Sequence, residues 1–122
     1  MKINRKILIA EDELVIAKVL QMQLEKSGYE VENVPDGNEV LAKAKQMQPS
    51  IIILDMRLKN NTNGLDAGKK IREAGIDTPI IFTTGNSYNK TVQMVKDISH
   101  TVVLTKPVEL EQLLKLLNNF NS

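Results

Sequence analysis

Short apolar runs alternate with amphipathic stretches along the whole chain. Five of these runs are typical of strands, namely residues 6–10 (KILIA), 29–34 (YEVENV), 50–55 (SIIILD), 77–85 (DTPIIFTTG) and 101–106 (TVVLTK). The third run is the most apolar and shows no alternation with polar residues, which predicts a strand buried on both faces. The second run is more polar, so we expect it at an edge of the sheet.

The stretches that follow these runs are predicted to be helices, namely residues 13–28, 38–48, 65–75, 86–98 and 107–120. In the first, Ile16, Leu20 and Leu24 recur at helical spacing with Ala17 beside them, which predicts the buried face. Gly28 follows as the expected C-terminal cap.

The fourth and fifth predicted helices also have an apolar side. In the fourth, Tyr88, Val92 and Val95 share one face. In the fifth, leucines at positions 110, 113, 114 and 117 recur on one side. We interpret them as core rather than as a coiled-coil seam, because the repeat spans too few heptads.

The alternation of strands and helices predicts the fold class. It favours an α/β fold with a parallel sheet covered on both faces and right-handed crossovers. The expected architecture is a flavodoxin-like, doubly wound, five-stranded sheet of order 2-1-3-4-5 with five helices. We expect the whole chain, residues 1–122, to form a single domain, because this length and a hydrophobic content of 42% suit one.

Composition narrows the classes of partner. Sixteen basic and fifteen acidic residues give a net charge of +1, and the chain has two tyrosines, two phenylalanines and no tryptophan. Direct nucleic-acid binding is therefore not expected. The absence of cysteine excludes disulfides and thiolate metal sites. No apolar run reaches the roughly 18 residues of a membrane helix, so we expect no membrane insertion and a cytoplasmic location.

Polar residues gather where the predicted strands end. Glu11 and Asp12 follow the first strand, and Asp55 ends the third. Thr84 lies at the end of the fourth strand and Lys106 at the end of the fifth. In an open parallel sheet of this order the first and third strands are neighbours, and ligands bind beyond the carboxyl ends of the strands. We therefore expect the acidic side chains to converge.

Three converging carboxylates repel one another unless a cation lies among them. Oxygen ligands favour a hard cation, and Mg²⁺ suits such a site. Lys106 adds a positive charge, and Thr84 adds a hydroxyl suited to a phosphate oxygen. The backbone N–H of Gly85, expected at the start of a helix, adds a further donor. This set of groups is typical of phosphoryl transfer, with Asp55 as the nucleophile.

The segments ILIAEDE, IIILDMRL, PIIFTTG and LTKP, in this order, resemble the receiver domain of two-component response regulators. The resemblance covers nearly the whole chain. It implies that Asp55 accepts a phosphoryl group from a phosphohistidine on a sensor histidine kinase or a histidine phosphotransfer protein. It also implies that Mg²⁺ is bound by Glu11, Asp12, Asp55 and the backbone carbonyl of Arg57.

The resemblance assigns the remaining site residues as well. Thr84 would contact the phosphoryl group, Lys106 would pair with it, and a cis Lys106–Pro107 bond is expected. Phosphorylation would bias the surface of the fourth helix, fifth strand and fifth helix towards a downstream protein or self-association. The chain would not be an enzyme beyond self-directed phosphotransfer and autodephosphorylation. Whether it stands alone, is attached to a histidine kinase or comes from a longer chain stays open.

Two features depart from the family pattern. The switch residues would be Thr84 and the residue three positions before Lys106, which is commonly aromatic in the family but is Val103 here. A valine has no ring to move inwards, so we expect a smaller conformational shift. The loop from Asp55 to Gly64 is one residue longer than in the commonest pattern.

Other readings remain open at this stage. The main alternative is a receiver-like docking module that is never phosphorylated. An aspartate-nucleophile phosphatase would usually carry a second aspartate where this chain has Arg57, and a flavin-binding protein would need a phosphate-cradling loop after the first strand. Glu11 and Asp12 could also simply favour the N-terminus of the first helix electrostatically.

Overall fold

The computed structural model describes residues 4–85 and 87–121, and within them five strands form one parallel sheet. The strands are β1 (Lys6–Ala10), β2 (Glu30–Val34), β3 (Ile51–Asp55), β4 (Ile80–Thr84) and β5 (Thr101–Thr105). Their order is β2-β1-β3-β4-β5. The predicted order is confirmed, and the most polar strand, β2, lies at an edge as expected.

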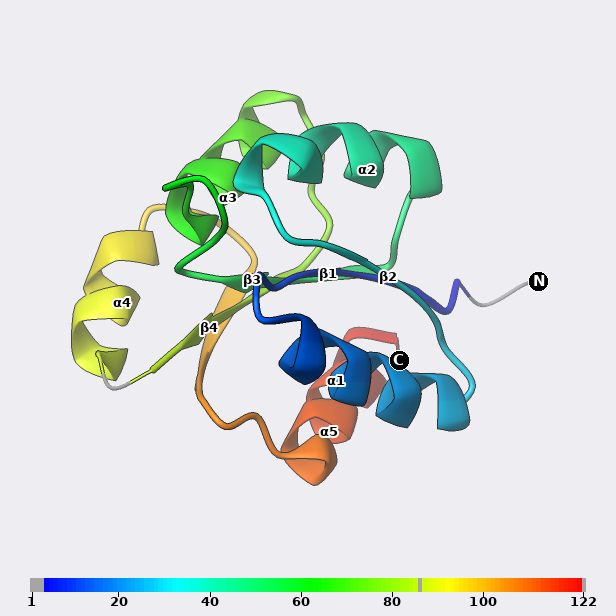
Figure 1. The fold of residues 1–122 in the computed structure, drawn as a ribbon. Helices are drawn as coiled ribbons and strands as arrows, with labels where there is room; N and C mark the ends of the chain where they lie inside the picture. The colour runs from blue at the N-terminus through cyan, green and yellow to red at the C-terminus, as the bar shows by residue number, and fades with distance from the viewer. Residues whose placement is uncertain (1–3, 86, 122) are drawn as a thin grey trace.

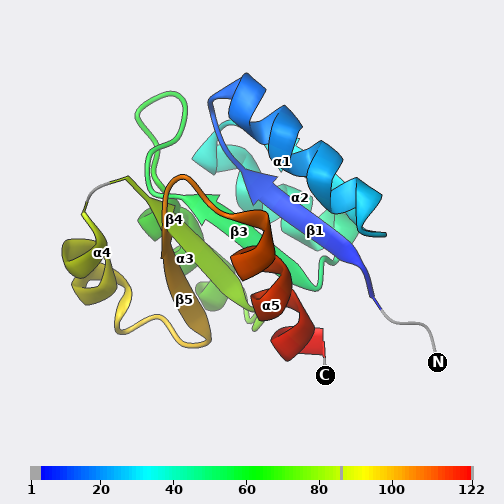
Figure 2. The same ribbon diagram turned by 90° about the horizontal axis from the view of Figure 1, so that it is seen from below.

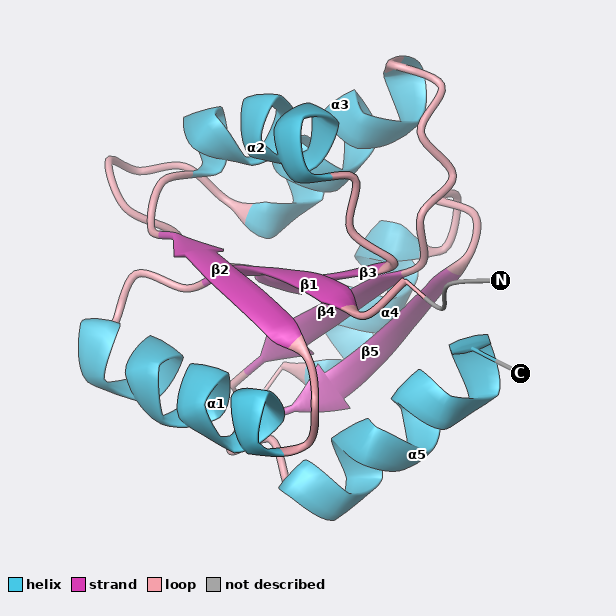
Figure 3. Cartoon of the chain, turned by 90° about the vertical axis from the view of Figure 1, so that its right-hand side faces the viewer, coloured by secondary structure: helices cyan, strands magenta, loops and turns pink. Residues whose placement is uncertain are grey.

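Helices cover both faces of this sheet (Figure 1). They are α1 (Leu14–Lys26), α2 (Val40–Met47), α3 (Gly64–Glu73), α4 (Tyr88–Val95) and α5 (Leu110–Asn121), with a short 3-10 turn, η1 (Gly37–Glu39), before α2. The helices α1 and α5 lie on one face, and α2 and α3 lie on the other (Figures 1 and 3). The predicted start of the fourth helix, Asn86, lies outside the described residues, as do residues 1–3 and 122. No helix in the described ranges has the length and apolar character to cross a bilayer.

Burial on both faces of the sheet explains the apolar run of β3, whose five residues are all buried. Ile52 and Leu54 pack towards α2 and α3, while Ile53 packs towards α1 and α5. On the second face, Leu113 and Leu117 of α5 are fully buried. The interpretation of these leucines as core is confirmed, and Figure 2 shows α1 and α5 together on this face.

The inner face of α1 differs in part from the prediction. Ala17 and Leu24 are buried, but Ile16 is 43% exposed. The helix begins just beyond the end of β1, so its first turn lies at the carboxyl edge of the sheet, where little of the sheet remains to cover it. The apolar residues of this turn therefore stay accessible to solvent.

The inner face of α4 also differs. Thr91 and Val95 are buried and continue to Ile98 just after the helix, whereas Tyr88 is 46% exposed. Tyr88 is the first residue of α4 and lies beyond the sheet edge. Hydrophobic periodicity alone did not distinguish the buried face with Thr91 from the predicted face with Tyr88 and Val92. A threonine at a buried helical position was not anticipated.

The end of α1 follows the prediction. Gly28 has a positive φ of 97°, a conformation that glycine adopts without steric cost. Its N–H donates to the Glu25 carbonyl, and the N–H of Tyr29 donates to the Leu24 carbonyl. These two bonds form a Schellman motif, which ends the helix and directs the chain into β2.

Candidate functional site

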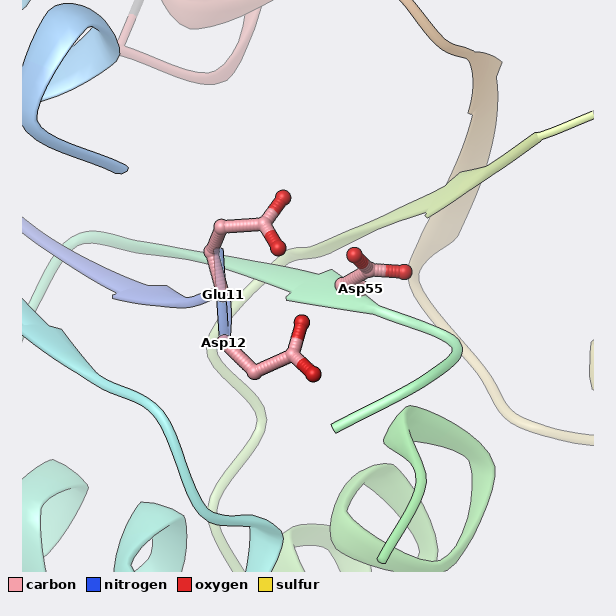
Figure 4. Close-up of side chains that lie close together, drawn as sticks. All are labelled: Glu11, Asp12 and Asp55. Carbon is pink, nitrogen blue, oxygen red and sulfur yellow. The ribbon is translucent and has the colours of Figure 1, made fainter. Parts of the chain in front are cut away.

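Three carboxylates meet at the carboxyl edge of the sheet. Glu11 and Asp12 follow β1, and Asp55 ends the adjacent strand β3 (Figure 4). Each offers a carboxylate oxygen, and these oxygens lie within 4.8 Å of one another. Glu11 and Asp55 are buried, while Asp12 is exposed. The expectation that these acids converge is confirmed.

Lys106 enters this cluster from the loop after β5. Its Nζ donates to Glu11 Oε1 at 2.6 Å and also donates to Asp55 Oδ2. The backbone N–H of Lys106 donates to the Thr84 carbonyl at 2.7 Å, and the Lys106–Pro107 peptide bond is cis as expected. The lysine thus contacts the acids of two strands at once.

Burial and the neighbouring charges shift the titration of this cluster. Burial raises the pKa of Glu11, and repulsion from Asp55 adds to this, although hydrogen bonds from Lys106 and the Glu13 amide oppose it. Burial alone would lower the pKa of Lys106, but its hydrogen bonds to Asp55 and Glu11 outweigh this and raise it. The ammonium form of the lysine is therefore favoured, and it offsets part of the repulsion between the acids.

The acids do not serve mainly as a helix cap. Glu13, the residue that precedes α1, makes no capping hydrogen bond with its own side chain. Glu11 Oε2 accepts from the Glu13 backbone N–H at 3.1 Å, so one acid contributes locally to the entry into the helix. The other carboxylate oxygen of Glu11 points to Lys106, which no helix-capping role explains.

The two predicted donors to a phosphate oxygen, the Thr84 hydroxyl and the Gly85 backbone N–H, are placed differently in the structure. Thr84 is buried and lines a hollow of about 680 Å³ together with Asp55 and Lys106. Thr83 instead lines a different groove, between α1 and the loop after β5. The expectation for Gly85 was wrong, because α4 begins only at Tyr88 and the Gly85 N–H is not at a helix start.

The start of the loop after β3 is shaped around Asp55. The backbone N–H of Arg57 donates to Asp55 Oδ1 at 3.1 Å, while the Arg57 side chain is exposed. The N–H of Gly64, the first residue of α3, donates to the Met56 carbonyl. A Cβ atom on Gly64 would lie 2.4 Å from the Asp55 carbonyl oxygen, so only glycine allows this close approach.

The rest of that loop is fastened to the turn after β2, which the sequence did not reveal. Asn60 Nδ2 donates to Asp36 Oδ2 at 2.6 Å, and the Gly37 N–H donates to Thr62 Oγ1 at 2.7 Å. Asn60 and Asn61 have positive φ values of 60° and 57°, which asparagine tolerates better than most residues. This part of the loop is thus held in a defined contact with the turn after β2.

The donor set fits a hard divalent cation. The three acids of the cluster offer carboxylate oxygens as ligands. The backbone carbonyl of Arg57 offers a further oxygen from the loop that begins directly after Asp55. Hard cations such as Mg²⁺ and Ca²⁺ prefer such oxygen ligands. Burial is the main cause of the raised pKa of Glu11, and a cation at this point would cancel the repulsion from Asp55 that adds to it.

Comparison with known proteins identifies the family to which this chain belongs. Residues 7–118 match the family model described as "Response regulator receiver domain". The chain belongs to this family. The similarity covers the whole sheet except Lys6, the first residue of β1, and it includes each of the strand ends at which the polar residues gather.

Curated relatives of this receiver chain are longer regulatory proteins. The chain is 34% identical over 104 residues to the alkaline phosphatase synthesis transcriptional regulatory protein PhoP of Bacillus subtilis. This alignment covers 85% of this chain and 43% of PhoP. It is 32% identical over 113 residues to the transcriptional regulatory protein PdtaR of Mycobacterium tuberculosis, covering 92% of this chain and 54% of PdtaR. The chain thus spans about half the length of these relatives.

Solved structures agree with the fold. The chemotaxis protein CheY4 of Vibrio cholerae aligns with a TM-score of 0.86 and 32% identity, covering 96% of this chain and 98% of that one. The receiver domain of the Francisella response regulator 1452 aligns with a TM-score of 0.86 and 26% identity, covering 97% of each chain. The flavodoxin-like architecture of a receiver is therefore shown by both sequence and structure.

Proposed function

We propose that this receiver accepts a phosphoryl group on Asp55 from a phosphohistidine, in a Mg²⁺-dependent reaction, and that the modification biases the surface formed by α4, β5 and α5. The observation that carries the proposal is the placement of Asp55. Its carboxylate borders an open hollow and is contacted by Lys106, beside the two further acids Glu11 and Asp12.

The transfer itself needs positioning more than new covalent machinery. A carboxylate oxygen of Asp55 forms a bond to phosphorus while the bond from phosphorus to the donor histidine nitrogen breaks, and an acyl phosphate results. The Lys106 ammonium, already at Asp55, is placed to follow the negative charge onto the phosphoryl oxygens. The Thr84 hydroxyl, in the same hollow, is placed to donate to one of them.

The acids would hold the metal. Glu11, Asp12 and Asp55, with the backbone carbonyl of Arg57, are the proposed protein ligands. Bound Mg²⁺ would neutralise charge on the phosphoryl oxygens during transfer. The hydrogen bond from the Arg57 N–H to Asp55 Oδ1 ties the proposed carbonyl ligand to the acceptor residue.

An apolar face beside the site suits the protein donor. Large side chains on α1 are unusually exposed: Leu14 at 68%, Val15 at 78%, Val19 at 51% and Met22 at 49%. A groove of about 500 Å³ between α1 and the loop after β5 includes Val15 and Val19 and reaches Glu11 and Lys106. An amphipathic helix of a histidine kinase or phosphotransfer protein could lie on this face and bring its histidine to Asp55.

The proposed output is a change of packing around α4 and β5. Val103 lies opposite Phe82 in the sheet and packs against the core cluster that includes Val95 of α4. Phosphorylation adds about one to two negative charges and three acceptor oxygens next to Thr84 and Lys106. Stronger contacts in one packing than in the other would shift the balance between them, towards a downstream protein or a second copy of the chain. The curated relatives are transcriptional regulators, so a downstream partner that binds DNA is compatible with this output.

The proposal is tested by labelling the protein with a small phosphodonor such as acetyl phosphate. With Mg²⁺, the intact protein should gain the mass of one phosphoryl group, and this gain should vanish with EDTA and in Asp55→Asn. Asp66→Asn, an exposed acid on α3, is the matched control and should still be labelled. If wild-type protein stays unlabelled with Mg²⁺ and also takes nothing from a phosphorylated histidine protein, the chain is instead a docking module of receiver fold.

A further inference from the structure

A buried hydroxyl pair connects the site to α4. Thr91, in the middle of α4, donates from Oγ1 to Thr84 Oγ1 at 3.1 Å. The two side chains are almost inaccessible, with exposed fractions of 3% for Thr91 and 5% for Thr84. A buried hydroxyl in the middle of a short helix is not needed for helix formation, since threonine is a poor helix former.

The hydrogen bond from Thr91 determines which further hydrogen bonds the Thr84 hydroxyl can make. A threonine hydroxyl carries one proton and can accept up to two hydrogen bonds. Because Thr84 accepts from Thr91, its own proton remains available for another acceptor. Both threonines line the hollow that also contains Asp55 and Lys106, so a phosphoryl oxygen on Asp55 would be an acceptor within that hollow. Thr91 therefore favours the orientation of Thr84 that suits phosphate binding.

The same bond links the site mechanically to α4. On the neighbouring strand, the position that faces this core carries Val103, which has no polar group and no ring to follow a movement of Thr84. Thr91, by contrast, is bonded directly to the Thr84 side chain and belongs to the helix that packs on β5. A displacement of the Thr84 hydroxyl towards a phosphoryl group would leave Thr91 without its buried partner unless α4 moved as well.

We propose that Thr91 is a positioning residue for Thr84 and the residue through which α4 responds to phosphorylation of Asp55. This inference rests on the proposed function and deepens it, because it assigns to a hydroxyl on α4 the coupling that Val103, which is not aromatic, cannot supply. It predicts that removing the Thr91 hydroxyl weakens the phosphoryl contact and uncouples α4 from the site.

The experiment compares wild-type protein, Thr91→Val and Thr91→Ser by amide NMR during titration with beryllofluoride and Mg²⁺. Valine keeps the shape without the hydroxyl, and serine keeps the hydroxyl. In wild-type protein, the amides of Arg57 at the site and of Lys90 and Gln93 on α4 should all shift. In Thr91→Val, Arg57 should still shift, beryllofluoride should bind about three- to tenfold more weakly, and the α4 shifts should largely disappear. Thr91→Ser should restore both properties.

The outcomes separate the two proposals. If the α4 amides of Thr91→Val shift as in wild-type protein, Thr91 only satisfies a buried hydroxyl and the inference is overturned. If the Arg57 amide of wild-type protein does not respond to beryllofluoride, the proposed function itself fails. Thermal unfolding checks that the variants are folded, and Thr91→Ala replaces the valine variant, with the same expectations, if that variant does not fold.

Discussion

Lys106 is the residue on which the electrostatics of the site depend. Its ammonium group contacts Glu11 and Asp55, two buried acids from different strands that would otherwise repel each other. The lysine thereby neutralises part of the negative charge of these acids, a role that we propose it shares with a divalent cation. Both cations are positive, so they should disfavour each other when no phosphoryl group is present.

Replacing this lysine should therefore strengthen metal binding. We expect Lys106→Met to bind Mg²⁺ about threefold to tenfold more tightly than wild-type protein, because removing one screened like charge a few Å away is worth on the order of 1 kcal/mol. Isothermal titration calorimetry measures the affinity. Lys45→Met, an exposed lysine on α2, changes the net charge equally and should leave the affinity nearly unchanged. Weaker binding in Lys106→Met would contradict this account.

The residues of the candidate site could be predicted from the sequence because each lies at the end of a strand or just after it. Parallel strands end at the same edge, so the positions of Glu11, Asp55 and Lys106 along the chain already imply a common location. Thr91 could not be found this way, since its role depends on a hydroxyl contact with a residue on β4. The bond between Asp36 and Asn60 was also hidden, because it joins two loops that only the folded chain brings together.

At the scale of elements, α1 and α4 differ in the side chains that they place at the two sides of the site. The first turn of α1 exposes apolar side chains and borders the groove that reaches Lys106. In α4 the polar residue Thr91 is buried instead and contacts Thr84. Hydrophobic periodicity predicted both helices but misplaced Ile16 and Tyr88, because the ends of these helices extend past the sheet that would have covered them. Input would thus occur over α1 and output over α4.

The proposed docking face on α1 can be tested separately from the chemistry. Val15 is 78% exposed, and Val15→Asp places a charge on the apolar face. We expect the rate of phosphoryl transfer from a histidine phosphotransfer protein, divided by the rate from acetyl phosphate, to fall at least about tenfold, as for an interface hot spot. Gln46→Asp adds the same charge to exposed α2 on the opposite face and should keep the wild-type ratio. An unchanged ratio in Val15→Asp would place the donor elsewhere.

At the scale of the whole molecule, one sheet edge gathers acids, a lysine and a hydroxyl from four strands. The two cores on either side of β3 hold these strand ends rigidly, because its apolar residues pack on both faces. Movement is then expected at the periphery, in α4. The fold itself was predictable from the alternation of strands and helices, whereas the output depends on contacts that the alternation does not encode.

The most direct test of the central claim is a crystal structure of the chain with Mg²⁺ and beryllofluoride. We predict that beryllium is bonded to the Asp55 carboxylate, with the metal beside Glu11 and Asp12. Lys106 and Thr84 should each lie within about 3.2 Å of a fluorine atom, as hydrogen-bond donors do. Beryllofluoride bound at another residue, or an Asp55 that keeps only its contact with Lys106 at saturating ligand, would contradict the account.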